Sequence, residues 1–520
     1  MPCSTNSEPV TGQSPPGQSA LKNSLMRSAD ASPLAVLRLI LGVTFWFWAS
    51  GFLQDDRWRI FFVQPILLFK YDYFRWVQIW PGDGIWWHFQ IVRVAAVCFA
   101  LGLLTRISGV LLSASMAYVL LVERQLYNNH DYLLACSVLI CALLPSQRRF
   151  SIDRILFHRS DWPTTMRHWH WWLVRFQLGL PYCFGGIAKL NADWLAGQPA
   201  GLFCSAHVDA PVVGPLLAMP HAATIMAWGG LMFDLFIVPA LLWKRTRPFA
   251  IVAALGFHLT NAMVFHIGVF PWFMIATLFV FFPIDFIPRL ITRLGGKKFG
   301  FESILPPNDA HPSLPASTLH KLAATAAVIY VVIQLLLPIR PWVMPGDAGW
   351  NERGHRFSWR MMLRHKDCLL WFKLVTEKDF LFAPATMVMT PSQVLRAPRD
   401  PELIRQAAVK IKQLATEIGQ PDCQVHALAL VSLNGRPAKP IVDPEVDLTG
   451  VTRGWWYDDW VPQDPGPLPQ DPWQVPPDQW WQSVDLGTSF SALKAYRPSQ
   501  AQVLYDQLRQ QELAKQPTQP

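Results

Sequence analysis

Long uninterrupted apolar runs restrict this chain more than any other feature of its sequence. A bilayer core of about 30 Å is crossed by about 20 helical residues, so each run of that length predicts one transmembrane helix. Because 51% of the residues are hydrophobic and only 16% are charged, we expect a mainly α, polytopic bundle of about nine helices. The expected spans are 33–54, 85–104, 107–123, 131–147, 171–189, 222–243, 248–265, 267–287 and 320–338, of which 131–147 is short for a span.

The rest of the chain divides into three further regions. Residues 1–30 are polar and rich in Ser, Pro and Gly, which predicts a disordered tail without a cleaved signal peptide. The transmembrane domain then covers 31–339. Alternating patterns, prolines and turn residues over 340–485 predict an extramembrane α+β domain containing strands. A polar, helical tail is expected over 486–520.

Local signals within the predicted extramembrane domain are strong. Asp400-Pro401 followed by apolar residues at helical spacing predicts a capped amphipathic helix that ends at Gly419. The alternating segment 424–433, the turn Asn434-Gly435 and the segment 437–442 predict a β-hairpin. The tryptophans of 455–481, set among Asp and Pro residues, indicate an extended strap on the domain or at the membrane surface.

Basic residues between the apolar runs predict the orientation of the chain. Short loops rich in Lys and Arg face the cytoplasm, which puts the N-terminus inside and the last domain outside. A smaller, even helix count is the alternative, and it would reverse the last domain. The net charge of +9 therefore serves orientation, and nucleic-acid binding is not expected. The basic loops are Arg148, Arg149, Arg154, Arg159 and Arg167; Lys244, Arg245 and Arg247; and Arg289, Arg293, Lys297 and Lys298.

Cysteine spacing argues against a metal site. The eight cysteines show no C-x-x-C pair and no His/Cys ligand spacing, so most are expected to be packing residues. A disulfide between Cys368 and Cys423 stays open, because both fall in the last domain. The chain has no Asn-x-Ser/Thr acceptor, which favours a bacterial plasma membrane over a glycosylating lumen.

Two polar segments interrupt the apolar pattern at the predicted outer face. They are ERQLYNNHDYL (123–133) and FHLTNAMVFHIG (257–268). Ionisable residues are costly in hydrocarbon, so such clusters indicate a functional site or internal pairs. Both segments fall on the side where the last domain emerges. We therefore expect a site shared by the bundle and that domain, and helix-to-helix hydrogen bonding is the alternative explanation.

The same residues resemble a known family. Seven segments carry the resemblance, in order along the chain: LGLLTRIS (101–108), YNNHDYL (127–133), VRFQLGLPYCFGGIAKLNADWLAG (174–197), GGLMFDL (229–235), FHLTNAMVFHIGVF (257–270), RFSWRMM (356–362) and VDPEVD (442–447). They are similar to the vitamin K-dependent gamma-glutamyl carboxylase family, in a bacterial form with a related multi-span domain. The resemblance implies an integral membrane enzyme that couples oxygenation of a reduced quinone to carboxylation of glutamate. It implies reduced vitamin K or a related quinol, with O2 and CO2, and a Glu-containing protein or peptide as substrate.

The resemblance also implies roles for individual residues. It places the family's basic lysine where this chain has Arg124, and arginine does not release its proton. His130 and His258 are then the candidate replacement bases. The implied quinol-binding residues are Asn128, Asn129, Arg175, Gln177, Asn261, His355, Ser358, Trp359, Met361 and Met362, the last five on the first strand of the outer domain. Lys189, Asp193 and Asp234 are expected in a buried polar skeleton, for which helix packing is the alternative role.

Two function classes follow. The first is the carboxylase-like enzyme with the bilayer as its surroundings and no metal. The second is a non-catalytic homologue that binds a quinone or lipid, and Arg124 is the residue that favours it. A transporter is not expected, because the chain shows no inverted repeat.

Overall fold

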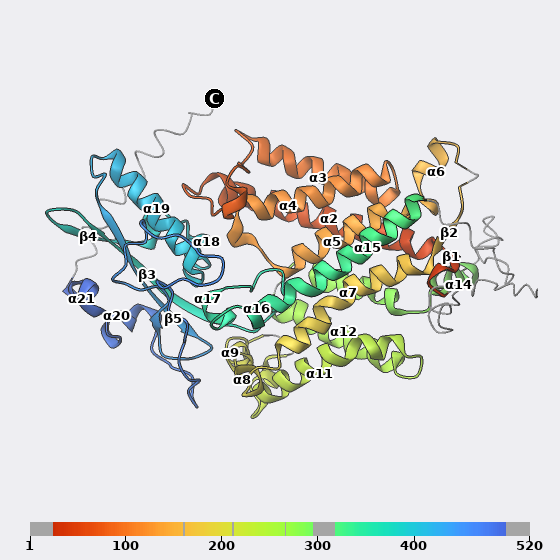
Figure 1. The fold of residues 1–520 in the computed structure, drawn as a ribbon. Coiled ribbons are helices and arrows are strands. Elements are labelled where there is room, and N and C mark those ends of the chain that lie inside the picture. The colour runs from red at the N-terminus through yellow and green to blue at the C-terminus, as the bar shows by residue number, and fades with distance from the viewer. Residues whose placement is uncertain (1–23, 160–161, 211–212, 266, 295–317, 496–520) are drawn as a thin grey trace, which may run out of the picture.

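A computed structural model describes residues 24–159, 162–210, 213–265, 267–294 and 318–495 of the chain. It consists of a helical bundle and a smaller mixed domain at one end (Figure 1). The main helices of the bundle are α2 Ser32–Leu53, α3 Gly84–Leu101, α4 Thr105–Val122, α5 Asn129–Leu143, α7 His168–Ala188, α11 Ala222–Leu242, α12 Arg247–Val264, α13 Phe270–Thr277, α14 Phe286–Arg293 and α15 Thr318–Leu336.

Five described helices are long and apolar enough to cross a membrane, or six if one bent pair counts as a span. They correspond to α2, α3, α4, α11 and α15 with their extensions. The helix α5 is apolar but shorter, and α7 and α12 are long enough but less apolar. The chain is therefore an integral membrane protein. The count of nine crossings stays a prediction.

The span predicted over 267–287 is not one continuous helix. The chain forms Phe270–Phe281 and Phe286–Arg293, which meet at 95°. Pro283 explains the break, because proline disfavours a helical conformation at the preceding residue, and Phe282 is extended with ψ of 169°. The guanidinium of Arg175 on α7 binds the carbonyls freed there, donating to Val280 O at 2.9 Å and Phe282 O at 2.5 Å.

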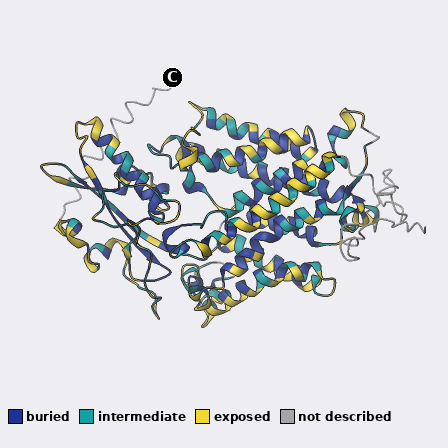
Figure 2. Cartoon of the chain, viewed as in Figure 1, coloured by how far each residue is buried: buried dark blue, intermediate teal, exposed yellow. Residues whose placement is uncertain are grey.

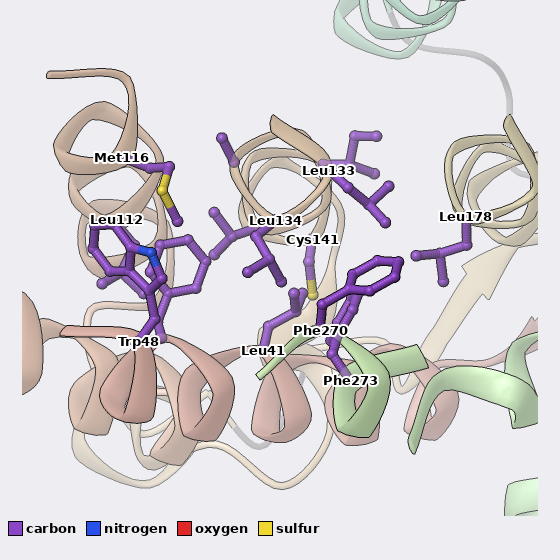
Figure 3. Close-up of a cluster of buried hydrophobic side chains, with 14 of the residues drawn as sticks. Leu41, Trp48, Leu112, Met116, Leu133, Leu134, Cys141, Leu178, Phe270 and Phe273 are labelled. Carbon is purple, nitrogen blue, oxygen red and sulfur yellow. The ribbon is translucent and has the colours of Figure 1, made fainter. Parts of the chain in front are cut away.

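The core of the bundle surrounds α5. Its short apolar helix lies between α2, α4, α7 and α13 (Figure 3). Because every neighbour presents large apolar side chains to it, α5 is held by packing although it is short. The side chains in this cluster include Leu41, Trp48, Leu112, Met116, Leu133, Leu134, Cys141, Leu178, Phe270 and Phe273.

Exposed apolar residues cover the outside of the bundle, as expected for lipid contact (Figure 2). The last span, α15, is the extreme case, because Gln334 is its one buried residue. Polar contacts from Gln334 and Tyr330 help to attach it to the bundle. Gln334 Nε2 donates to Tyr132 Oη at 2.6 Å, and Tyr330 Oη donates to Gln177 Oε1.

The end of the bundle away from the mixed domain carries β1 Ser28–Asp30, β2 Thr165–Arg167, α6 Ile152–Leu156 and α14 (Figure 1). The strands β1 and β2 pair antiparallel, so the last residues of the predicted N-terminal tail are ordered by pairing and not disordered. Residues 1–23 lie outside the described part of the chain. The connection between α7 and α11, at the other end, holds α8 Ala192–Leu195, α9 Ala200–Ser205 and α10 Gly214–Leu217.

The terminal domain is built on one antiparallel sheet with the order β4-β3-β5-β6. Its strands are β3 Lys366–Val375, β4 Phe380–Pro384, β5 Gln424–Leu433 and β6 Lys439–Pro440. The helix α19 Pro401–Glu417 packs against β5 and buries Leu403, Ala407, Ile411 and Leu414. This confirms the predicted α+β domain.

The predicted local signals in this domain hold. Asp400 caps α19 by accepting from the backbone N–H of Glu402 at 2.9 Å. Asn434 and Gly435 both have positive φ, 53° and 82°, which suits the tight turn between β5 and β6. The strap 455–481 is mostly irregular, with Trp460 and Trp480 buried on the domain.

The disulfide left open between Cys368 and Cys423 does not form, because both are free thiols. One expectation for this domain is wrong. The segment 355–362 is a series of turns before β3, not a strand, because Phe357, Trp359 and Met362 have positive φ of 62°, 55° and 60°. The remaining short α-helices of this domain are α16 Arg340–Val343 and α17 Ala348–Asn351 before the turns, and α18 Pro391–Val394, α20 Trp480–Ser483 and α21 Gly487–Phe490 after them. The predicted tail 486–520 is described as far as Ala495.

Candidate active site between the bundle and the terminal domain

A cavity of about 530 Å³ lies where the bundle meets the terminal domain. Both polar segments singled out in the sequence reach it, as does the turn segment before β3. The structure therefore brings together, at one cavity, residues that are far apart in the chain. The predicted site residues that line it are Asn128, Asn129, His130, His258, Asn261, His355, Met361 and Met362.

Arg124 does not line this cavity and is held in an ion pair with the terminal domain. Its Nη2 lies 3.2 Å from Oδ2 of Asp400, and Nη1 of Arg356 lies 2.9 Å from the same oxygen. Both guanidiniums also face the ring of Tyr71, at 5.2 and 6.0 Å from its centroid. Burial would raise the pKa of Asp400, but the neighbouring Arg124 and Arg356 hold it well below its ordinary value. The contacts of Arg124 are those of a domain-joining residue.

Lys189 and Asp234 form a buried pair on the bundle side of the cavity. Each side chain is about nine-tenths buried or more, and Lys189 Nζ donates to Asp234 Oδ2. The ammonium also lies 5.0 Å from the centroid of the Trp194 ring. Lys189 follows the end of α7 and Asp234 lies within α11, so the packing of these two helices creates the pair. The pair lines the cavity, which the assignment to a polar skeleton did not anticipate.

The two candidate histidines occupy the same wall. His258 on α12 lies with Nε2 2.7 Å from Oη of Tyr182 on α7. His130, at the start of α5, stacks on the ring of Phe270 with centroids 3.7 Å apart. Phe270 in turn lies edge-on to His258, at 6.4 Å. Two imidazoles thus share one aromatic wall.

The asparagines of the motif are engaged locally. Asn128 caps α5, accepting from the backbone N–H of Asp131 at 2.8 Å and donating to its carboxylate at 2.6 Å. Asn129 accepts from Tyr127 Oη at 3.0 Å. The same hydroxyl accepts from the backbone N–H of Phe357 in the terminal domain, at 2.7 Å. The motif therefore shapes the wall of the cavity and ties it to the terminal domain.

Besides Arg124, four of the predicted site residues do not line the cavity. Arg175 caps the break after α13, and Gln177 binds Tyr330 of α15. Ser358 donates to the carbonyl of Gly354, and Trp359 is fully buried within the turn segment. Their contacts are structural, and the two terminal-domain residues hold the turns that carry Met361 and Met362.

The terminal domain contributes a cationic wall that the sequence analysis missed. Six cationic side chains line the cavity against two carboxylates, Glu352 and Asp400. Glu352 is shared by Arg364 and Lys366, at 2.8 and 2.7 Å. The regular spacing of the first three arginines was the available signal. The six are Arg356, Arg360, Arg364, Lys366, Arg396 and Arg399.

Positive charge is in excess on this wall. Within the described chain, Arg360, Arg396 and Arg399 form no ion pair. Burial, and after it the neighbouring cations, lower the pKa of His355 well below its ordinary value, so its imidazole is neutral. The wall is suited to an anion.

A second cavity of about 340 Å³ adjoins the first. Apolar residues of α2 and the following turn line much of it, including Phe47, which is 56% exposed on the outside of the bundle. The second cavity therefore shares part of its wall with the polar chamber and reaches the lipid-facing side of α2. The residues common to both are Leu126, Asn128, His130, Ile267, Phe270 and Arg396.

Buried polar atoms without a protein partner indicate which kind of ligand would fit the cavities. Orphaned donors are costly unless an occupant satisfies them. A ring with oxygen substituents would meet them in the first cavity, and an apolar tail would fit the second. A quinol with an isoprenoid tail therefore fits. The orphaned atoms of lining residues are Nδ1 of His258 and His355 and Nε of Arg356, Arg360, Arg364 and Arg399.

No group of His, Cys, Asp or Glu within the described residues is arranged to hold a metal ion. The site is thus a polar chamber of paired side chains and free guanidiniums.

Three further attachments fix the terminal domain over this site. The first is the Arg124–Asp400–Arg356 cluster. In the second, Arg436 binds Asp193 of the α7–α11 connection through both guanidinium Nη atoms, at 2.7 and 2.8 Å. In the third, Gln406 exchanges two hydrogen bonds of 2.9 Å with the backbone of Lys70, next to Phe69, which is fully buried in the terminal domain's core.

Comparison with known proteins agrees with both parts of this architecture. A family model of the HTTM domain matches residues 26–286, just over half of the chain. The lumenal domain of vitamin K-dependent gamma-carboxylase matches residues 319–465. No solved structure matches the chain. A membrane bundle and a lumenal domain of this kind, joined in this order around one cavity, show that the chain belongs to the vitamin K-dependent gamma-carboxylase family.

Proposed function

We propose that the chain is an integral membrane enzyme that carboxylates glutamate with the help of a reduced quinone. One observation carries the proposal: one cavity is lined by both the buried Lys189–Asp234 pair and the free guanidiniums of the terminal domain, and it shares a wall with a second cavity that reaches the lipid-facing Phe47. Reduced vitamin K or a related quinol, with O2, would supply the strong base that removes a γ-proton from glutamate before CO2 adds.

Lys189 is the best candidate for taking a proton in the cavity. Arg124 cannot take this role, because a guanidinium keeps its proton and this one is bound to Asp400. A buried lysine can release its proton. When the proton shared by the pair lies on Asp234 Oδ2, the lone pair of Lys189 Nζ is free to accept another. Asp234 then keeps the ammonium next to a hydrogen-bonding partner.

The arginine wall supports an acidic substrate. Arg360, Arg396 and Arg399 have no carboxylate partner among the described residues, and arginine binds carboxylates through two parallel hydrogen bonds. A glutamate side chain presented from the terminal domain would meet these guanidiniums before it reached Lys189. We propose that they hold the carboxylate of a Glu-containing protein or peptide.

The test is a carboxylation assay on purified protein with reduced vitamin K, labelled bicarbonate and a Glu-containing peptide. Lys189→Arg keeps the charge pair with Asp234 but cannot release its proton. We expect incorporation by the wild type, loss in Lys189→Arg and little change in Arg124→Lys. Lys378→Arg, in an exposed turn, is the matched control.

The outcomes separate the hypotheses. Activity in Lys189→Arg would remove Lys189 from the proposal while keeping the enzyme. If the wild type shows no carboxylation but still binds the quinone, the second candidate, a non-catalytic quinone- or lipid-binding homologue, would be favoured. The observation behind that candidate is Arg124, which is committed to the terminal domain.

We also propose nine crossings, with the N-terminus in the cytoplasm of a bacterium and the terminal domain outside its plasma membrane. Three facts support this: β1 and the terminal domain lie at opposite ends of the bundle, α6 and α14 with their arginines lie at the end of β1, and lumenal-type domains face away from the cytoplasm in their family. Alkaline phosphatase fused after Pro520 should be active. If the phosphatase fusion were inactive and a cytoplasmic fluorescent reporter fused at the same position were fluorescent, the terminal domain would lie in the cytoplasm and the proposed topology would be wrong.

A further inference from the structure

Tyr182 and His258 form a hydrogen-bonded pair in the wall of the cavity. Tyr182 lies on α7 and His258 on α12, with Oη and Nε2 2.7 Å apart. Both side chains are buried and both line the cavity. The rings of Phe233 and Phe257, stacked at 4.0 Å, and that of Phe270 surround the imidazole.

The pair contains one more hydrogen than its protein surroundings can bind. A neutral tyrosine and a neutral histidine together carry two polar hydrogens, one O–H and one N–H. A single hydrogen bond between them uses one of the two. If Tyr182 donates, the hydrogen on Nδ1 of His258 is left over; if His258 donates from Nε2, the hydroxyl hydrogen is left over. Nδ1 has no partner within the described residues, and His258 is the one partner the structure gives Tyr182 Oη.

The remaining hydrogen therefore needs an acceptor that the protein does not supply. Buried donors are almost always satisfied in folded proteins. Protonating His258 would not resolve the imbalance, because it would add another donor and a charge among three phenylalanine rings. Within the described residues, no hydrogen bond joins either side chain to the nearby carboxylate of Asp234.

We propose that the Tyr182–His258 pair is a neutral hydrogen-bond donor to one oxygen of a flat, ring-shaped ligand of the quinone class. The inference rests on the proposed function, and it changes the role expected for His258 from proton acceptor to donor. Tyr182 is the positioning residue that makes the pair a unit. The phenylalanine rings around the imidazole are suited to hold an aromatic ring beside it.

The test measures binding, so it does not depend on turnover. Menadione has two carbonyl oxygens, and 2-methylnaphthalene has the same ring system without oxygen. Both can be titrated into purified full-length protein by quenching of tryptophan fluorescence. We expect Tyr182→Phe and His258→Gln each to weaken menadione binding by about five- to tenfold, the effect of one hydrogen bond, and to leave 2-methylnaphthalene unchanged.

Two further variants sharpen the result. The double variant should lose no more affinity than either single variant, because the two side chains act as one donor. Tyr330→Phe removes a buried hydroxyl that binds Gln177 outside the cavity and should leave menadione binding unchanged. Equal loss for both probes, unchanged binding in both single variants, or multiplied effects in the double variant would overturn the inference while leaving the proposed function intact. Wild-type protein that does not bind menadione would overturn both.

Discussion

The two walls of the cavity treat charge in opposite ways. On the bundle side, Lys189 is matched one to one with Asp234, and Tyr182 with His258, in pairs that carry no net charge. On the terminal-domain side, six cations meet two carboxylates. The difference follows from the surroundings: hydrocarbon makes an unmatched charge costly, whereas a wall near water tolerates an excess and can offer it to a ligand. Matched charges stabilise the fold, and unmatched ones are available for binding.

The largest expected effect comes from the one carboxylate that balances two guanidiniums across the junction. Asp400→Asn keeps the helix cap, because asparagine caps as well as aspartate, but leaves Arg124 and Arg356 without their anion. We expect a loss of about 3–5 kcal/mol in the free energy of unfolding, measured by thermal denaturation in detergent.

The control for this variant is Asp422→Asn, which changes an exposed carboxylate near the start of β5. It should unfold like the wild type. If Asp400→Asn also unfolded like the wild type, the terminal-domain wall would not depend on its carboxylates for stability.

On the bundle wall, stability should fall when only one of Lys189 and Asp234 is replaced, and not when both charges are removed together. Lys189→Met and Asp234→Leu each leave one unmatched polar group and should each cost about 3 kcal/mol of stability. The double variant removes both groups and should recover most of that loss while remaining inactive. Denaturation of the three variants forms a cycle, and additive losses would show that the pair is not a unit.

Glu123, directly after α4, tests how a single acid at the boundary is accommodated. Burial raises its pKa to about 8, with weak hydrogen bonds from Gln125 and Phe69 opposing the shift. The folded chain then holds this proton more tightly than the unfolded chain. The contribution of Glu123 to stability is therefore greatest below the pKa of the unfolded chain and falls as pH rises toward the folded-state pKa, by about 2 kcal/mol between about pH 6 and about pH 8.

Glu123→Gln is the matched neutral variant. The pH dependence of its unfolding free energy should be flatter than that of the wild type over this interval. Parallel curves would mean that Glu123 is ionised in the folded protein and that another cation, such as the nearby Lys70, balances it.

The smallest effect on stability is expected on the arginine wall. Replacing Arg360 and Arg399 together by Gln removes charges without ion-pair partners, so stability should change by less than about 0.5 kcal/mol. Binding of an acidic, Glu-containing peptide should nevertheless weaken by about tenfold, and its salt dependence should decrease. Lys378→Gln is the control, and unchanged peptide affinity in the double variant would contradict the assigned role of the wall.

The features that were predicted correctly from the sequence are those that depend on neighbouring residues in the chain. The cap at Asp400-Pro401 and the turn at Asn434-Gly435 involve neighbours in the chain, and both were predicted correctly. The turns at 355–362 were not, because burial of Trp359 and contacts of Ser358 decide a backbone that the residues alone do not favour. The break at Pro283 was a missed local signal, since the apolar pattern continues through it.

The site depended on contacts between distant residues. The polar motifs predicted that the bundle and the terminal domain share a cavity, and the structure places eight of the predicted residues there. The resemblance placed Arg124 at the position of the family's basic lysine, and no local pattern could predict its partner, Asp400, which lies 276 residues away. Lys189 and Asp234 are 45 residues apart, so no local pattern joins them. Residue type predicted the groups, and helix packing decided their partners.

The three attachments of the terminal domain have a consequence for synthesis. The bundle emerges from the ribosome first and reaches the membrane with Arg124, Asp193 and Phe69 still lacking their partners. Each finds its partner only when the terminal domain, which supplies Asp400, Arg436 and the core around Phe69, has been made. An unfinished or truncated chain therefore exposes a cation, an acid and an apolar ring that the complete chain covers.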